Sequence, residues 1–148
     1  MMKLFNSTFE VSLRALLLLS VTSDKNMTVD RIISYDFFVI YSQCFGLSDI
    51  NLHGDNNYGF CELSAHRKSF SEALKILVLD GLAKAIQCSN GFCYTITETG
   101  WAFCRTQKTE YANTYRRLAK AACQVYDDFS EVELLAVINQ RSAEALRR

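Results

Sequence analysis

The sequence predicts a mostly α-helical protein that carries one small β-hairpin. The chain of 148 residues contains no proline, as expected for long helices with few rigid loops. Between Phe70 and Phe103 a helical pattern ends at Asp80-Gly81, a pair typical of a helix C-terminus, and Leu82 begins an extended run. Asn90-Gly91 is the strongest short-range signal for a tight type I′ turn. A helix, a hairpin and a further helix in this order indicate the second half of a winged-helix domain.

The turn also sets the expected register and the domain boundary. It places Cys88 opposite Cys93, and Thr97 is then the expected N-cap of the next helix. We therefore expect a winged-helix domain over residues 1–104. The helices of residues 105–148 are expected to pack on this domain or to extend from it.

The N-terminal segment has an early lysine and an apolar run, which look superficially like a signal peptide. Glu10 and Arg14 interrupt this run, and Ala15–Leu19 is far shorter than the about 20 apolar residues that span a membrane. Ser7 and Glu10 have the spacing of a capping box, and Glu10 and Arg14 have that of an ion pair on a helix surface. The segment therefore predicts a buried amphipathic helix and no contact with a membrane.

The remaining segments also favour helices. Apolar residues recur at helical spacing from Val29 to Cys44, and a polar loop follows from Gly46 to Cys61. A second apolar stripe predicts a long helix from about Lys108 to Tyr126. Ser130 and Glu133 have the spacing of another capping box, which would open a last helix.

Charge and motif content argue against several function classes. The 16 basic and 16 acidic residues give a formal net charge of zero, whereas a dedicated DNA-binding module usually carries a basic excess. The sequence shows no nucleophile–base constellation, no Gly-rich phosphate loop and no paired-carboxylate motif. We therefore expect neither catalysis nor a cofactor.

Six cysteines raise the question of a disulfide framework or a zinc site. Disulfides need an oxidising compartment, and the N-terminus gives no convincing signal for one, although Cys88 and Cys93 could pair under oxidation. The cysteine spacings are irregular and there are only two histidines, so the pattern does not favour zinc. Buried small hydrophobic side chains are the better interpretation, and an enzyme built on cysteine or zinc is the weakest function class.

A winged-helix DNA-binding transcriptional regulator is the main alternative function. Ser64–Leu79 would be its recognition helix, where Glu72 opposes the basic residues. The wing tip Gln87–Thr95 contains no basic residue for phosphates or the minor groove. His66 is expected at the surface. The candidate DNA contacts are His66, Arg67, Lys68 and Lys75.

The chain resembles a known family over nearly its whole length. The motifs that carry the resemblance are FNS followed by LRALLLL within Phe5–Ser20, the YD pair within Asp30–Gly46, and the helix–wing segment. These look like the small middle component of bacterial ABC-type three-component defence systems of the Lamassu-like kind. In the loop, His53, Tyr58 and Glu62 match the family, whereas its prolines are missing and Gly59 stands where the family has arginine.

The resemblance implies a cytoplasmic, non-catalytic adaptor. Its partners would be an SMC/Rad50-like ATPase that senses foreign or aberrant DNA and an effector, commonly a nuclease, with DNA contacted through the complex. Basic residues on the long helix would pair with acidic surface on a partner, and reversing exposed charges there is expected to leave the fold intact. The candidate interface residues are Tyr111, Tyr115, Arg116, Arg117 and Lys120.

Overall fold

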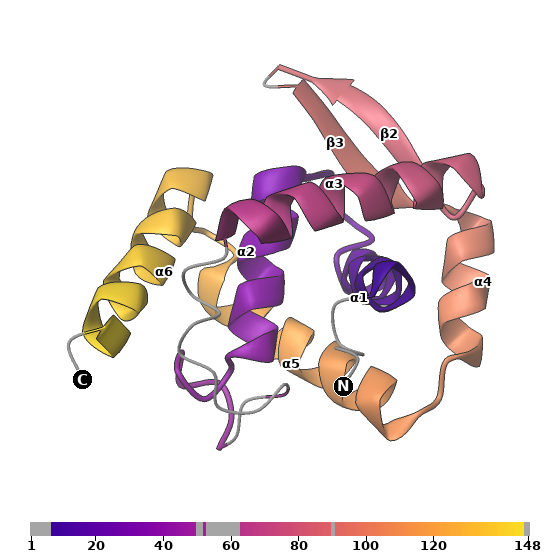
Figure 1. The fold of residues 1–148 in the computed structure, drawn as a ribbon. Helices are drawn as coiled ribbons and strands as arrows, with labels where there is room; N and C mark the ends of the chain where they lie inside the picture. Colours follow the sequence, from indigo (N-terminus) through magenta and orange to yellow (C-terminus); the bar gives the residue numbers. More distant parts are fainter. Residues whose placement is uncertain (1–6, 50–51, 53–62, 90, 147–148) are drawn as a thin grey trace.

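A computed structural model describes residues 7–49, 52, 63–89 and 91–146, and within them the protein is mostly helical with a three-stranded antiparallel sheet (Figure 1). The prediction of a mostly α-helical chain with a hairpin is confirmed, and the third strand was not predicted. The elements in chain order are α1 (Thr8–Val21), β1 (Met27–Thr28), α2 (Val29–Ile40), α3 (Leu63–Leu79), β2 (Ala83–Cys88), β3 (Gly91–Ile96), α4 (Glu98–Thr106), α5 (Glu110–Tyr126) and α6 (Glu131–Leu146).

Helix α1 is the centre of the molecule. Figure 1 shows it end-on, with α2, α3, α4 and α5 arranged around it, and α1 contacts each of these helices. Val11 and all residues from Arg14 to Ser20 are buried. A helix enclosed on every side needs apolar residues on every side, which explains the leucine run that looks like a signal peptide. None of the helices in the described ranges is long and apolar enough to cross a membrane.

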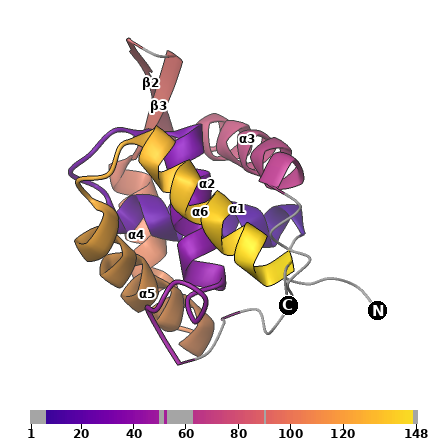
Figure 2. The same cartoon turned by 90° about the vertical axis from the view of Figure 1, so that its left-hand side faces the viewer.

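The sheet has the strand order β1-β3-β2, with both pairs antiparallel. In Figures 1 and 2 the β2–β3 hairpin projects beyond the helices. The predicted register of the hairpin is wrong, because Cys88 pairs with Gly91 and Cys93 pairs with Ile86. Cys93 is also paired with Thr28 of β1 and is buried, so the third strand and the core fix the register as well as the turn. The shift of two residues leaves every side chain on its expected face.

Two glycines determine how α3 connects to the hairpin and how closely α4 follows it. Gly81 has φ +75°, and the bonds Leu82 N–H to Leu77 O (2.8 Å) and Gly81 N–H to Val78 O (3.1 Å) form a Schellman motif that ends α3 as predicted. Gly100 lies in the first turn of α4, where a Cβ atom would stand 2.1 Å from the carbonyl oxygen of Leu82. Only glycine therefore allows α4 to pack this closely on the start of β2.

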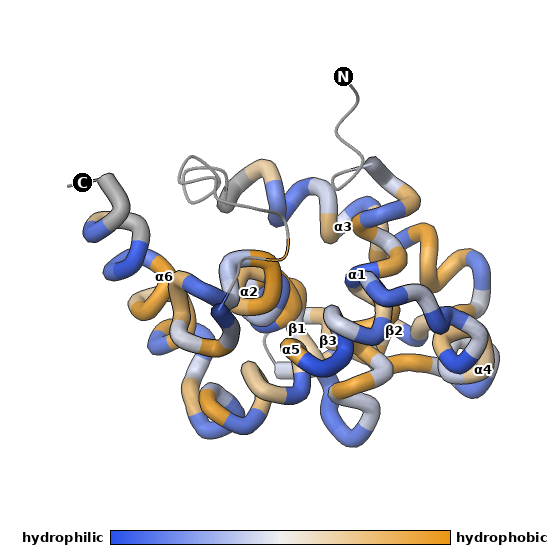
Figure 3. The backbone as a smooth tube through the Cα atoms, turned by 90° about the horizontal axis from the view of Figure 1, so that it is seen from below, coloured by the Kyte–Doolittle hydropathy of each residue, from blue (hydrophilic) through white to orange (hydrophobic). Residues whose placement is uncertain are grey.

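The C-terminal helices pack on the rest of the protein. Helix α5 contacts both α1 and α2, and α6 contacts α2, across which it runs in Figure 2. In Figure 3 hydrophobic residues predominate in α2, whereas hydrophobic and hydrophilic residues alternate along α5 and α6, as expected for helices with one exposed face. The predicted capping box of α6 is present, since Glu133 N–H donates to Ser130 Oγ (3.1 Å) and Ser130 N–H donates to Glu133 Oε1 (2.8 Å).

A buried polar cluster joins α1, α2 and α5. Arg14 on α1 donates two hydrogen bonds to Asp36 on α2, from Nε to Oδ1 (3.0 Å) and from Nη2 to Oδ2 (3.2 Å). The Tyr115 hydroxyl on α5 donates to Asp36 Oδ1 (2.7 Å). All three side chains are inaccessible to solvent. The expected ion pair between Arg14 and Glu10 is present, at 3.6 Å, but it does not lie on the surface, because the Arg14 side chain is buried and its principal partner is the buried Asp36.

The cluster keeps its charges in place although it is buried. Burial disfavours the charged guanidinium, but the nearby Asp36 carboxylate favours it, and the pKa of Arg14 is raised above its ordinary value. Burial, and then Asp36, raise the pKa of Tyr115 well above its ordinary value, so that the hydroxyl remains a donor. Such a bidentate pair loses several interactions at once when one partner is removed.

The first prediction concerns this cluster. We expect Asp36→Ala to lower the free energy of unfolding by about 3–5 kcal/mol, because the buried Arg14 would lose its bidentate partner and keep only the longer contact with Glu10. Tyr115→Phe removes one hydrogen bond and keeps the ion pair, so its expected cost is about 1–2 kcal/mol. Urea unfolding of the variants measures both. The matched control is Arg141→Ala, which breaks an exposed pair with Glu144 and should cost no more than about 0.5 kcal/mol.

Candidate functional site

Two concave surfaces lie on either side of α4. The helix begins at its predicted N-cap, Thr97, whose Oγ1 accepts from Gly100 N–H (3.0 Å), and its exposed aromatic residues are Trp101 and Phe103. Two residues along a helix correspond to about 200° of rotation, so these side chains point to opposite faces. Phe103 lines an apolar groove, and Trp101 lines a basic pocket.

The apolar groove lies between α1, α3 and α4 and has a volume of about 330 Å³. Phe9 on α1 is 72% exposed at this groove, and Ile76 on α3 is also exposed there. Asp80 is the one ionisable side chain among the described lining residues. An exposed aromatic side chain beside an apolar groove is typical of a protein-binding surface. The lining residues are Thr8, Phe9, Ser12, Leu13, Leu16, Ile76, Leu77, Asp80, Leu82 and Phe103.

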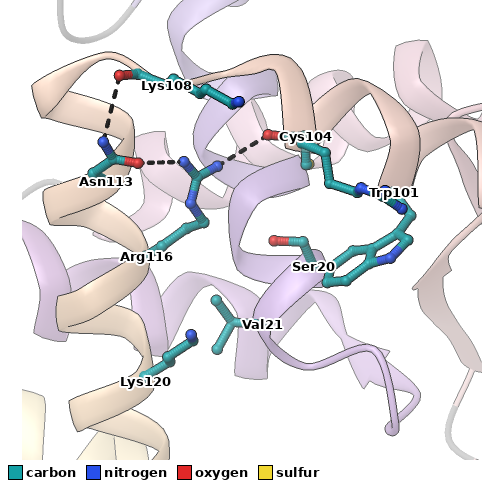
Figure 4. A pocket seen from close by; sticks show the side chains of 9 residues that line it. Ser20, Val21, Trp101, Cys104, Lys108, Asn113, Arg116 and Lys120 are labelled. Atoms are coloured by element: carbon teal, nitrogen blue, oxygen red, sulfur yellow. Dashed lines mark hydrogen bonds between the residues drawn. The ribbon is translucent and has the colours of Figure 1, made fainter.

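The basic pocket lies between α1, α4 and α5 and has a volume of about 380 Å³. Figure 4 shows Trp101 on one side of it and Arg116 and Lys120 on the other, with Ser20 and Val21 of α1 between them. The described residues that line it include four basic side chains and no acidic one. Its lining residues are Ser20, Val21, Trp101, Cys104, Arg105, Lys108, Asn113, Arg116 and Lys120.

Arg116 has a structural role in this pocket, because it connects α4 to α5. Its Nη1 donates to the carbonyl oxygen of Cys104 (3.1 Å), and its Nη2 donates to the carbonyl oxygen of Gln107 and to Asn113 Oδ1. These bonds tie the last turn of α4 to the first turns of α5 (Figure 4). The positive guanidinium also lies at the negative end of the α4 dipole. Arg116 is therefore not the exposed charge that the sequence suggested, and we expect its reversal to disturb the α4–α5 connection.

The five candidate interface residues do not share one surface. Tyr115 is fully buried and bonded to Asp36, so it cannot face a partner in this structure. Tyr111 is half-buried, and burial raises its pKa above the ordinary value. Arg116 and Lys120 line the basic pocket, whereas Arg117 is exposed outside it. A period of 3.6 residues places positions 116 and 120 on one face and position 117 on another.

The four candidate DNA contacts are also divided. His66 is buried and its ring lies 4.8 Å from that of Phe37, so the expectation that it lies at the surface is wrong. Arg67 is exposed but forms an ion pair with Asp30 at the start of α2 (2.7 Å). Lys68 and Lys75 are exposed on α3. The loop residues His53, Tyr58 and Glu62 lie outside the described residues.

The cysteines of the described ranges are all free thiols. Cys88 and Cys93 are diagonal rather than opposite, because their register differs from the predicted one. Burial, with a contribution from Cys88, raises the pKa of Cys93 to about 11. Cys104 is buried and its Sγ lies 3.6 Å from the carbonyl oxygen of Leu16. Within the described ranges no group of three or more His, Cys, Asp or Glu side chains could hold a metal ion.

Sequence reasoning missed three residues of the basic pocket: Trp101, Arg105 and Lys108. Trp101 and Arg105 have the i, i+4 spacing of one helix face, whereas Lys108 lies beyond Thr106, the last residue of α4, so no helical period indicates it. These residues lie near the basic residues of α5 because α4 and α5 both pack on α1.

Comparisons with known proteins give one match. A model of the family described as ABC-three component (ABC-3C) system Middle Component 2 matches residues 4–148. No curated protein and no solved structure matches the chain.

The second prediction compares two neighbouring arginines. We expect Arg116→Ala to lower the free energy of unfolding by about 1–3 kcal/mol, because three acceptors at the α4–α5 connection lose their donor. Arg117→Ala is the matched control and should cost no more than about 0.5 kcal/mol, since this side chain is exposed. Thermal or urea unfolding measures both. Equal stability of the two variants would contradict the structural role of Arg116.

Proposed function

We propose that this chain, which belongs to the middle component 2 family of ABC-three component systems, is a non-catalytic adaptor subunit. In this proposal it acts in a cytoplasmic, Lamassu-like defence complex directed against phages or plasmids. It links an SMC/Rad50-like ATPase that senses DNA to an effector such as a nuclease. Membership of a three-component system implies partner subunits. The observation that carries the adaptor role is the exposed apolar groove between α1, α3 and α4.

The arrangement of elements supports a winged-helix domain adapted to protein contacts. The elements follow the order α1-β1-α2-α3-β2-β3, with strand order β1-β3-β2, and in this proposal α3 corresponds to the recognition helix and the β2–β3 hairpin to the wing. However, residues 41–62 separate α2 from α3, whereas a DNA-binding helix-turn-helix uses a turn of about three or four residues. This long connection favours a surface that is not specialised for the major groove.

The charges on α3 also favour a protein partner over DNA. Of its four candidate DNA contacts, His66 is buried and Arg67 is paired with Asp30. Lys68 and Lys75 remain, and Glu72 is exposed on the same helix. Phosphate contacts supply most of the affinity for DNA. Lys68 and Lys75, which form no ion pair within the described residues, would therefore give α3 only a low affinity for a duplex.

The apolar groove is suited to a hydrophobic segment of the ATPase subunit. Phe9 and Ile76 are solvent-exposed in the isolated chain, and covering them would remove apolar area from water. Buried aromatic side chains commonly contribute most of the binding energy at a protein interface. None of the four candidate DNA contacts of α3 lines this groove.

The third prediction tests the adaptor role by co-purification of all three components. We expect the native chain to co-elute with the ATPase subunit in size-exclusion chromatography. Phe9→Glu should lower the affinity at least about tenfold, because a charge would be placed in the apolar interface. Val132→Glu is the matched control, since Val132 is 77% exposed on α6 and does not line the groove.

Circular dichroism and unfolding of the free variants provide the second control. Both substitutions affect exposed side chains, so both variants should be as stable as the native chain within about 0.5 kcal/mol. A native chain that elutes alone in the presence of its system's ATPase would overturn the adaptor role. Co-elution that Phe9→Glu and Val132→Glu leave equally strong would show that the partner occupies another surface.

The fourth prediction separates the adaptor from the transcriptional regulator. We expect the isolated protein to bind duplex DNA weakly or not at all at physiological salt, with a Kd no tighter than the roughly 10⁻⁴–10⁻⁶ M of non-specific binding. Fluorescence anisotropy with labelled duplexes of several sequences measures this affinity. Lys75→Glu should change it little. Tight binding that selects one sequence, and that Lys75→Glu abolishes, would favour the regulator.

A further inference from the structure

We propose that the basic pocket binds a nucleoside phosphate, with the base against the indole of Trp101 and the phosphate among Arg105, Lys108 and Lys120. This inference is independent of the adaptor role, because the pocket and the apolar groove lie on opposite faces of α4. Three features of the pocket point to this ligand: its charge, the position of the indole and its volume.

The positive charge of the pocket favours an anionic ligand. In the described part of the chain, none of Arg105, Lys108 and Lys120 forms an ion pair, and no acidic residue lines the pocket. The protein as a whole has as many acidic as basic residues, so this local excess of positive charge is not a consequence of composition. A concave surface lined by one sign of charge raises the local concentration of counter-ions.

Helix dipoles do not account for all of these cations. The last turns of α1 and α4 border the pocket, and the carbonyl groups at a helix C-terminus attract positive charge. Arg116 already donates hydrogen bonds to carbonyl oxygens at the end of α4, those of Cys104 and Gln107. The side chains of Arg105, Lys108 and Lys120 make no such bond within the described residues, so their charges are available to a ligand.

The indole of Trp101 adds a flat apolar surface next to these charges. Trp101 is 43% exposed, although a tryptophan in a single-domain protein is usually largely covered. A base can stack on an exposed indole, while basic side chains nearby hold its phosphate, as in many proteins that bind single-stranded nucleic acid. An acidic peptide would satisfy the cations but has no flat ring system for the indole.

The size of the pocket limits the ligand. About 380 Å³ is at the lower end of the range for small-molecule sites, which suits one nucleotide and excludes a base-paired duplex. The ligand is therefore either a free mononucleotide or a terminal nucleotide of a single strand. Both present the same chemistry, a base joined to a phosphate, and the experiment below distinguishes them.

The fifth prediction uses Trp101 as its own reporter, because it is the only tryptophan in the chain. We expect AMP, a 5′-phosphorylated single-stranded tetranucleotide, or both, to change the fluorescence of the full-length protein saturably. Saturation by AMP identifies a free mononucleotide as sufficient, whereas saturation by the tetranucleotide alone identifies a strand terminus. Adenosine lacks the phosphate and inorganic phosphate lacks the base, so each should bind at least about tenfold more weakly.

Charge reversals locate the ligand. Lys108→Glu and Lys120→Glu should each weaken the binding at least about tenfold, because they place a negative charge next to the phosphate. The matched control, Lys75→Glu, changes an exposed lysine on α3 and should leave the affinity unchanged within about twofold. Arg116 is not used as a probe, since its bonds hold α4 and α5 together. Circular dichroism of each variant confirms that the fold is retained.

Three outcomes would overturn the proposal. The first is a fluorescence that neither AMP nor the tetranucleotide changes at millimolar concentration. The second is an affinity that Lys75→Glu lowers as much as Lys108→Glu and Lys120→Glu do, which would indicate a diffuse effect of charge. The third is tighter binding of an acidic peptide such as hexaglutamate than of either nucleotide, which would make the pocket a docking site for protein.

Discussion

The ion pair between Arg14 and Asp36, with the hydroxyl of Tyr115 bonded to the same carboxylate, is the interaction on which the rest of the structure depends. It lies where α1, α2 and α5 meet, so it joins the N-terminal helices to the C-terminal ones at a point from which water is excluded. The bidentate pair fixes α1 relative to α2, and the directional bond from the Tyr115 hydroxyl attaches α5 to the same carboxylate. The cluster therefore specifies how the two ends of the chain combine.

This cluster also gives a physical meaning to the motifs on which the resemblance of the sequence rests. Arg14 belongs to the LRALLLL segment and Asp36 to the YD pair, and in the structure they bind each other. Ser7, the last residue of the FNS segment, caps α1 through its bond from Glu10 N–H (3.2 Å). The motifs therefore build the framework of the domain. The basic pocket also includes Arg105 and Lys108, which lie outside these motifs.

The features that could be predicted from the sequence are those determined within a few residues. The end of α3 at Gly81, the N-cap at Thr97 and the capping box of Ser130 and Glu133 depend on local backbone bonds, and each was found. The features that were missed depend on contacts between distant segments. The spacing of Glu10 and Arg14 suggested an exposed pair. The principal partner of Arg14 is Asp36, 22 residues further along the chain, and no local sequence pattern indicates it. The two-residue strand β1 is likewise too short to show a period and exists only through its pairing with β3.

Thr28 belongs to two structures at once. Its backbone pairs with Cys93 in the sheet, and its Oγ1 accepts from Arg31 N–H (3.2 Å) as the N-cap of α2. The sheet that anchors the hairpin and the first turn of α2 therefore depend on the same residue. Tilting the hairpin at its base requires either that β1 separate from β3 or that the first turn of α2 open. The anchorage of the hairpin therefore depends on the start of the same helix that carries Asp36.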